Sequence, residues 1–157
     1  MSRGLRDALG CFATGVAIVT TRDGEQDIGM TCSTFNSVSL DPPLVLWNLQ
    51  RHVESAPAFL NSEGYTVSVL SAKQTDLAMH FSKGTQQQRF AEIDASYAPS
   101  GRVIIPGCVA WFDCSLHQAV SAGDHEIMLG GVEDFEHFSG EGLIFERSRF
   151  GVLQAAA

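Results

Sequence analysis

The sequence predicts a single, mainly β domain, an antiparallel β-barrel with a few short peripheral helices. The chain has 157 residues, the size of one domain, and no repeat, low-complexity tract or long linker divides it. Its 45% hydrophobic and 18% charged residues exclude a disordered chain. Most strand-like segments follow one another directly, without the regular crossover helices that a parallel α/β sheet requires.

The strands are predicted from β-rich or alternating segments that stop at turn residues. Residues 16–21 and 27–32 flank the turn signal at 22–24 and predict a hairpin. A short strand at 38–40 stops at Asp41-Pro42-Pro43, because proline cannot donate to a strand ladder. The other strands are expected at residues 44–49, 65–70, 109–120, 125–138 and 143–145.

Three short helices are expected, one before the first strand and two between later strands. Residues 5–13 place their apolar side chains on one helical face. Ser55 followed by Pro57 is typical of a helix start. A third helix is expected at 75–81, and the polar run 82–88 is expected to be a loop.

The charge and the cysteines indicate the setting in which the chain works. With 18 acidic and 10 basic residues the formal charge is −8, which argues against nucleic acid or an anionic membrane surface as the main partner. Any anionic ligand must therefore be bound by a few groups that contact it directly, and not by the overall charge. Asp7 stands where a signal peptide would be apolar, and no segment approaches 18 apolar residues, so a cytoplasmic protein without a membrane span is expected.

The four cysteines form no C-x-x-C pair, and we expect buried, inert free thiols. Cys108 and Cys114 are expected on one face of one strand, ~20 Å apart.

Hydrolase, nucleotide-loop and zinc-spacing motifs are absent, so no metal site is predicted. The densest polar segment is residues 29–39, whose small hydroxyl and amide side chains could hold a flat heteroaromatic ring and a phosphate. The alternative is an ordinary Ser/Thr-rich strand and turn.

Three motifs, in this order and spacing, resemble the flavin reductase-like family: FATGVAIVTT at 12–21, GMTCSTFNSVSLDPPLV at 29–45 and AGDH at 122–125. The resemblance covers a core of about residues 5–150, within one domain over residues 1–157. It implies an FMN-binding split β-barrel of Greek-key topology that binds flavin at a homodimer interface. It also implies an NAD(P)H:flavin oxidoreductase, which reduces FMN or FAD with NADH or NADPH and supplies reduced flavin by diffusion to a flavin-dependent monooxygenase.

The resemblance assigns binding roles to particular residues. Those implied near the isoalloxazine ring are Thr31, Cys32, Ser33, Thr34, Ser37 and Val38. The strand end and helix start implied to face the ribityl phosphate carry Asn48, Gln50, Arg51 and Ser55. A loop near the flavin tail is matched less closely, by Phe81, Ser82, Lys83, Arg89 and Phe90.

Two further residues are implied near the nicotinamide. His125, in the Gly123-Asp124-His125 turn, would lie over the flavin as the catalytic residue that orients the nicotinamide. Phe150 would lie on the same side of the pocket. Without the family, His125 is an exposed turn residue and Phe150 a packing residue.

The aromatic residues of the two long strands predict core or dimer packing, and hence a homodimer. They are Trp111, Phe112, Phe135 and Phe138. Two other functions stay open. One is a non-catalytic flavin-binding protein for storage or sensing. The other is a flavin-dependent oxidase of a small amine, which would call for more Arg and Lys at the phosphate.

Overall fold

The computed structural model describes residues 3–154, and every strand pair in this range is antiparallel. The helices are α1 (Arg3–Leu9), α2 (Ala56–Leu60), α3 (Thr75–His80) and α4 (Gln86–Phe90). The strands are β1 (Thr14–Gly15), β2 (Ala17–Asp23), β3 (Gln26–Cys32), β4 (Asn36–Leu40), β5 (Pro43–Gln50), β6 (Gly64–Val69), β7 (Ser96–Tyr97), β8 (Val103–Ile104), β9 (Ala110–Ala122), β10 (His125–His137), β11 (Ile144–Glu146) and β12 (Arg149–Gly151). The predicted mainly β antiparallel fold with short helices is confirmed.

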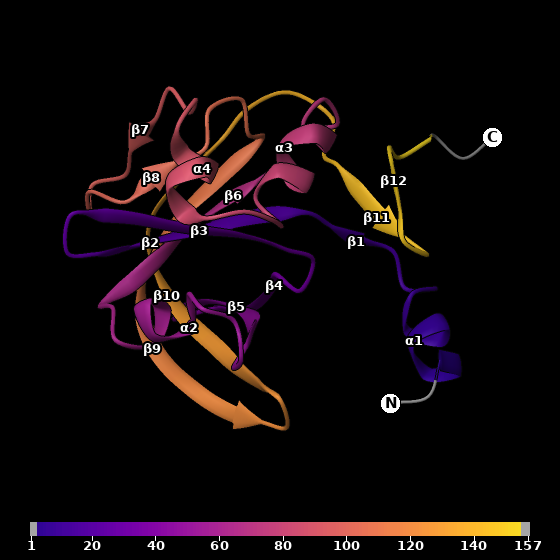
Figure 1. Cartoon of the computed structure of the whole chain (residues 1–157), viewed down its shortest axis with the longest axis horizontal. Coiled ribbons are helices and arrows are strands. Elements are labelled where there is room, and N and C mark those ends of the chain that lie inside the picture. The colour runs from indigo at the N-terminus through magenta and orange to yellow at the C-terminus, as the bar shows by residue number, and fades with distance from the viewer. Residues whose placement is uncertain (1–2, 155–157) are drawn as a thin grey trace.

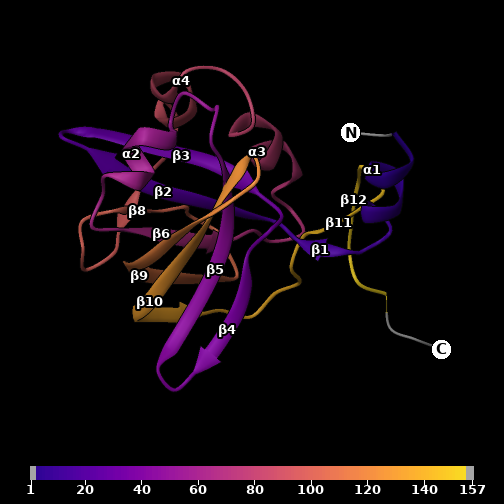
Figure 2. The same cartoon turned by 90° about the horizontal axis from the view of Figure 1, so that it is seen from below.

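Seven strands form the main sheet, in the order β3-β2-β6-β9-β10-β5-β4. The predicted hairpins β2–β3 and β9–β10 are neighbours in it, and β4 pairs with β5. The sheet curls, because β3 and β5 are not adjacent in this order yet their side chains share one core. Figure 1 shows α2 on the opposite side of the β2–β3 hairpin from α3 and α4, and Figure 2 shows α2, α3 and α4 on one side of the curled sheet.

Strand β2 is buried on both faces, because its alternating side chains enter two different cores. Ala17 and Val19 point into the first core and Ile18 into the second. The first core is centred on Trp47, whose ring meets Phe59 of α2 edge-on at a centroid distance of 5.0 Å. The second core lies against α3.

Buried polar side chains attach residues 95–105 to the outer face of this sheet. Thr20 Oγ1 donates to the carbonyl of Val103 at 2.6 Å, and Ser68 Oγ accepts from the amide of Ile105 at 3.1 Å. Asp113 is buried and paired with the largely buried Arg102 at 3.3 Å. Because a buried polar group without a partner is costly, these contacts determine where the segment lies.

An arm built from α1, β1, β11 and β12 stands apart from the curled sheet and carries both ends of the described chain (Figures 1 and 2). Pairing of β1 with β11 and a bond from the amide of Arg147 to the carbonyl of Gly10 hold it together. Helix α1 ends at Leu9, earlier than predicted, and none of its residues is buried. The arm's exposed large apolar side chains are Leu5, Leu9, Phe12, Val152 and Leu153.

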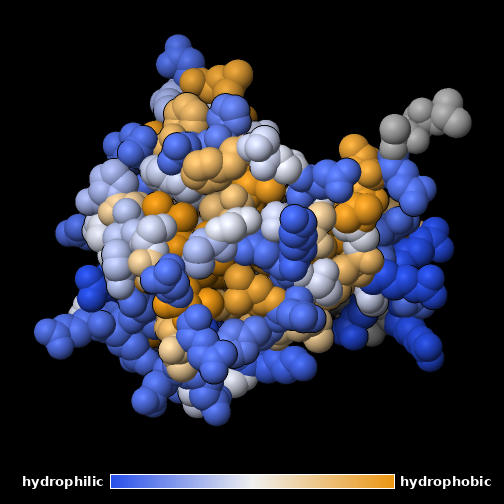
Figure 3. Space-filling model, turned by 90° about the horizontal axis from the view of Figure 1, so that it is seen from above, coloured by the Kyte–Doolittle hydropathy of each residue, from blue (hydrophilic) through white to orange (hydrophobic). Residues whose placement is uncertain are grey.

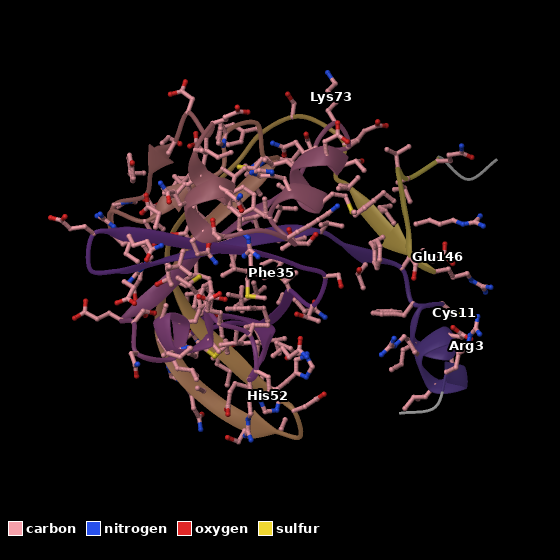
Figure 4. All side chains as sticks on the ribbon, in the orientation of Figure 1. Arg3, Cys11, Phe35, His52, Lys73 and Glu146 are labelled. Atoms are coloured by element: carbon pink, nitrogen blue, oxygen red, sulfur yellow. The ribbon has the colours of Figure 1, made fainter. Side chains whose placement is uncertain are left out.

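Several sequence predictions need correction. Helix α4 lies partly inside the segment expected to be a loop, and the short strands β1, β7, β8 and β12 were not predicted. Cys108 precedes β9 and so does not share a strand with Cys114. All four cysteines are free, as expected, but Cys11 is exposed on the arm (Figure 4). None of the described helices is long and apolar enough to cross a membrane.

Candidate functional site

Helix α4 docks on the outer edge of β3 at Gly29. Strand β3 is an end strand of the sheet, and the amide and carbonyl of Gly29 point away from β2. In a larger sheet another strand would bind these two groups. The amide donates to Gln86 Oε1 at 2.8 Å, and the carbonyl accepts from Arg89 Nη1 at 2.7 Å. Two side chains of α4 therefore provide the hydrogen bonds that another strand would give to Gly29.

The close approach requires glycine at position 29. A Cβ atom there would lie 2.8 Å from Cζ of Phe90 and 2.9 Å from Cε1 of Phe81. These two rings meet edge-on at 5.1 Å and pack with the second core. Phe90, the last residue of α4, was predicted near the flavin tail, but it packs on Phe81 and anchors α4 to the second core.

A polar groove of about 620 Å³ runs between β3, the start of α2 and the α3–α4 segment. Its lining includes Thr31, Gln50, Ser55, Ser82, Gln86 and Arg89. Five of these six were implied as binding residues by the family resemblance, and Phe81 also reaches this lining. Gln86 was not predicted. The pattern Thr85-x-x-Gln88, a capping box that starts α4, was the signal that could have revealed this helix.

A second, largely apolar groove of about 370 Å³ lies between α3 and the arm. Val16, Phe145 and Phe150 contribute to its walls, with Cys32 and Ser33 from the end of β3. The two grooves share Thr31 and Ser82, so they meet at these residues. Figure 3 shows the same contrast on one face: apolar side chains lie in a hollow and beside the arm, surrounded by polar ones.

The hydroxyl groups where the grooves meet are already hydrogen-bonded as donors. Thr31 Oγ1 donates to the carbonyl of Ala78 at 2.7 Å, and Ser82 Oγ donates to the carbonyl of Met79 at 2.6 Å. Each hydroxyl keeps a lone pair, so toward a ligand it is an acceptor. The Thr31 bond also ties β3 to α3.

Other predicted binding residues lie outside both grooves. Thr34 Oγ1 accepts the amide of Asn48 at 2.9 Å, which joins the segment after β3 to β5. Ser37 and Val38 are exposed on β4. Lys83 lines a separate hollow of about 490 Å³ beside α3 and α4.

The Cys32 side chain belongs to the first core, although the residue also borders the apolar groove. Burial raises the pKa of its thiol to about 11, so it stays protonated at neutral pH. Burial likewise raises the pKa of Cys114 to about 12. Both match the expectation of inert thiols.

The two arginines near the grooves have different surroundings. Arg51 Nε is paired with Glu126 at 2.7 Å, and Glu126 also accepts from Ser121 Oγ at 2.9 Å. Arg89 lines the polar groove, and partial burial lowers its pKa while the carboxylate of Glu54 opposes that shift. A guanidinium remains charged in proteins, so Arg89 brings a positive charge into this groove.

His125 lies at the start of β10, at the tip of the long hairpin. Its Nδ1 donates to Asp124 Oδ1 at 2.8 Å, and this bond lowers the pKa of the Asp124 carboxyl. His125 faces Gln50 across the β5–β10 pair, so both side chains leave the same face of the sheet. The amide of Arg51 also bonds to the carbonyl of Asp124, and Figure 4 shows the neighbouring His52 beside this tip.

The aromatic residues of the long strands divide between core and surface. Trp111 is buried, whereas Phe135 and Phe138 are exposed. Phe112 lies between Phe35 and Phe135, at centroid distances of 5.4 and 6.4 Å. The row ends at the surface of β10.

Comparison with known proteins gives one consistent result. Residues 9–154 match the family described as the flavin reductase like domain. The FMN reductase (NADH) SmoA of Agrobacterium fabrum is 41% identical over 150 residues, covering 96% of this chain and 85% of that protein. The reductase component of the flavin-dependent trigonelline monooxygenase of Acinetobacter baylyi is 36% identical, covering 94% of this chain but 48% of that protein.

A solved structure is similar over almost the whole chain. It is the NADH:FAD oxidoreductase SgcE6 of Streptomyces globisporus in complex with NAD and FAD fragments, with a TM-score of 0.91 and 35% identity. The similarity covers 98% of this chain and 93% of that one.

We expect Gly29→Ala to lower the free energy of unfolding by roughly 1–3 kcal/mol, because the added methyl group would push α4 off β3. Urea denaturation measures this change. Gly15→Ala is the matched control, since nothing lies within 4 Å of its Cβ position. A Gly29→Ala protein as stable as the parent would contradict the tight docking of α4.

Proposed function

Because the chain belongs to the flavin reductase-like family, we propose that its two grooves hold the flavin of an NAD(P)H:flavin oxidoreductase. The enzyme transfers a hydride from NADH or NADPH to FMN or FAD. The observation that carries this assignment is the junction of a polar groove containing a cation with an apolar groove. A flavin has the same division, with a flat ring at one end and a phosphorylated tail at the other.

The polar groove suits the ribityl phosphate. Arg89 supplies the positive charge, and Ser55, Gln50 and Gln86 supply uncharged polar groups. The carboxylates of Asp23 and Glu54 also line this groove, so the phosphate contact depends on Arg89 facing it directly. Arg89 Nε and Nη1 are bonded to the carbonyls of Lys83 and Gly29, which leaves Nη2 without a hydrogen-bond partner among residues 3–154. In an acidic chain this is the local anion site that the charge requires.

The apolar groove suits the isoalloxazine ring. Val16, Phe145 and Phe150 would cover its faces, and Thr31 and Ser33 would meet its polar edge. When bound, the flavin supplies the hydride acceptor. These residues orient the ring and exclude water from it.

His125 is proposed to orient the nicotinamide. Asp124 holds Nδ1, so the ring presents Nε2 on the face of the sheet that also carries Gln50. Gln50 lines the polar groove, so the cross-strand pairing of His125 with Gln50 supports a place for His125 near the rim. Hydride transfer needs no general base. With Nδ1 donating to Asp124, Nε2 of the neutral imidazole is an acceptor, and one hydrogen bond accepted there is enough for this role.

We propose that the active protein is a cytoplasmic homodimer that passes reduced flavin by diffusion to a separate flavin-dependent monooxygenase. The arm supports the dimer, because Leu9, Phe12 and Leu153 are more than 60% exposed on it. Free thiols support a reducing compartment. Oxidation of NADH or NADPH, measured at 340 nm and seen only when flavin is added, tests the reductase. Flavin binding without turnover would instead indicate a storage or sensing protein.

Arg89→Gln should weaken FMN binding by roughly 10- to 150-fold, the value of one charge-assisted hydrogen bond. Arg51→Gln should change it by less than about threefold, because Glu126 already neutralises Arg51. Fluorescence titration measures both affinities. The reverse order would place the phosphate at the end of β5, where the sequence predicted it.

His125→Ala should keep the flavin dissociation constant within about twofold and lower the rate of flavin reduction by NADH by about 5- to 150-fold. Anaerobic stopped flow measures that step, and dithionite reduction is the control that needs no nicotinamide site. Reduction by NADH at the parent rate would return His125 to the role of an exposed turn residue.

Sedimentation should give twice the 16.9 kDa chain mass at micromolar concentration. A monomer that still turns over flavin would remove the dimer from the proposal.

A further inference from the structure

Arg89 is held at both ends. Its guanidinium bonds the carbonyl of Lys83 at 2.9 Å through Nε and the carbonyl of Gly29 at 2.7 Å through Nη1. Its own backbone carbonyl lies 3.1 Å from His80 Nε2. The direction of the side chain therefore depends on the backbone position of α4 as well as on the groove.

Helix α4 has only five residues and cannot hold that position alone. Thr85 and Gln88 cap its first turn reciprocally. At the other end, His80 Nε2 lies 3.2 Å from the carbonyl of Gln88 and 3.1 Å from that of Arg89. The carbonyls of a last helical turn lack partners within the helix, and a ring N–H of His80 can donate to both.

His80 itself stays outside the two grooves. It lines the separate hollow beside α3 and α4, together with Asp76 and Lys83. Its ring stands edge-on to Phe81 at a centroid distance of 5.7 Å, which fixes it against the second core. His80 thus touches the helix that carries Arg89 without lining either groove.

We propose that His80 is a positioning residue that holds Arg89 over the polar groove and thereby sets the preference of this enzyme for phosphorylated flavins over riboflavin. The inference rests on the proposed function, since it assumes that Arg89 binds the flavin phosphate. Riboflavin has the same ring and ribityl chain but no phosphate, so binding of riboflavin reports the rest of the site. A purely structural role would affect both ligands equally.

The test compares the dissociation constants of FMN and riboflavin in four single variants and one double variant at one pH. His80→Phe keeps an aromatic ring against Phe81 and removes the N–H donor. His80→Gln places an amide N–H where Nε2 lies and should restore the function. Arg89→Gln is the reference, and His117→Ala on the exposed part of β9 is the matched control.

The expected result for His80→Phe is FMN binding weaker by about 3- to 10-fold, with riboflavin binding within about twofold of the parent. His80→Gln and His117→Ala should resemble the parent. In the double variant of His80→Phe and Arg89→Gln, the loss should not exceed that of Arg89→Gln alone, because His80 acts through Arg89.

Other outcomes distinguish a failure of the positioning role of His80 from a failure of the phosphate assignment of Arg89. Equal losses for FMN and riboflavin in His80→Phe, or additive losses in the double variant, would overturn the positioning role while Arg89 keeps its own. If Arg89→Gln leaves the preference for FMN unchanged, the phosphate assignment fails and the inference about His80 falls with it.

Discussion

At Gly29 the edge of the main sheet is completed by two side chains of α4 and not by another strand. The same contact brings Gln86 and Arg89 to the polar groove. The docking of α4 therefore bonds the free backbone groups of Gly29 and also places a positive charge in the groove. It depends on the absence of a side chain at Gly29, because the rings of Phe81 and Phe90 occupy the space that a Cβ would need. A backbone amide and carbonyl left bare at this edge would each cost free energy, which gives α4 a definite place to dock.

The two grooves follow from the way β2 and β3 divide the interior. Side chains from both faces of β2 are buried, in separate cores, and the apolar groove opens between the second core and the arm. The polar groove opens on the other side of Thr31, beside α2. The two grooves meet at Thr31, and its bond to the carbonyl of Ala78 keeps β3 and α3 together there.

The distribution of charge explains how an acidic protein can bind an anionic cofactor. The net charge of −8 repels anions at long range, so binding requires a cation that faces the ligand directly. Arg51 is paired with Glu126, and that pair joins the end of β5 to the turn that carries Asp124 and His125. Arg89 is held by backbone carbonyls, which orient a guanidinium without pairing its charge, although the carboxylate of Glu54 lies near enough to act on its pKa.

Local sequence pattern was enough to predict several strands, the family and many of the groove residues. The turn residues between 16–21 and 27–32 specify a hairpin. The polar cluster at 29–39 and the Gly123-Asp124-His125 turn identify the family, and this resemblance implied Thr31, Ser33 and Ser55, which the structure places at the grooves. Only the tertiary structure decided which hydroxyls and which arginine remain available. Thr31 and Ala78 are 47 residues apart, and Gly29 and Arg89 are 60 apart. Periodicity and turn chemistry describe how a segment is built and which face it buries, but they do not specify which distant backbone carbonyl it will meet, and that pairing is what separates Arg89 from Arg51.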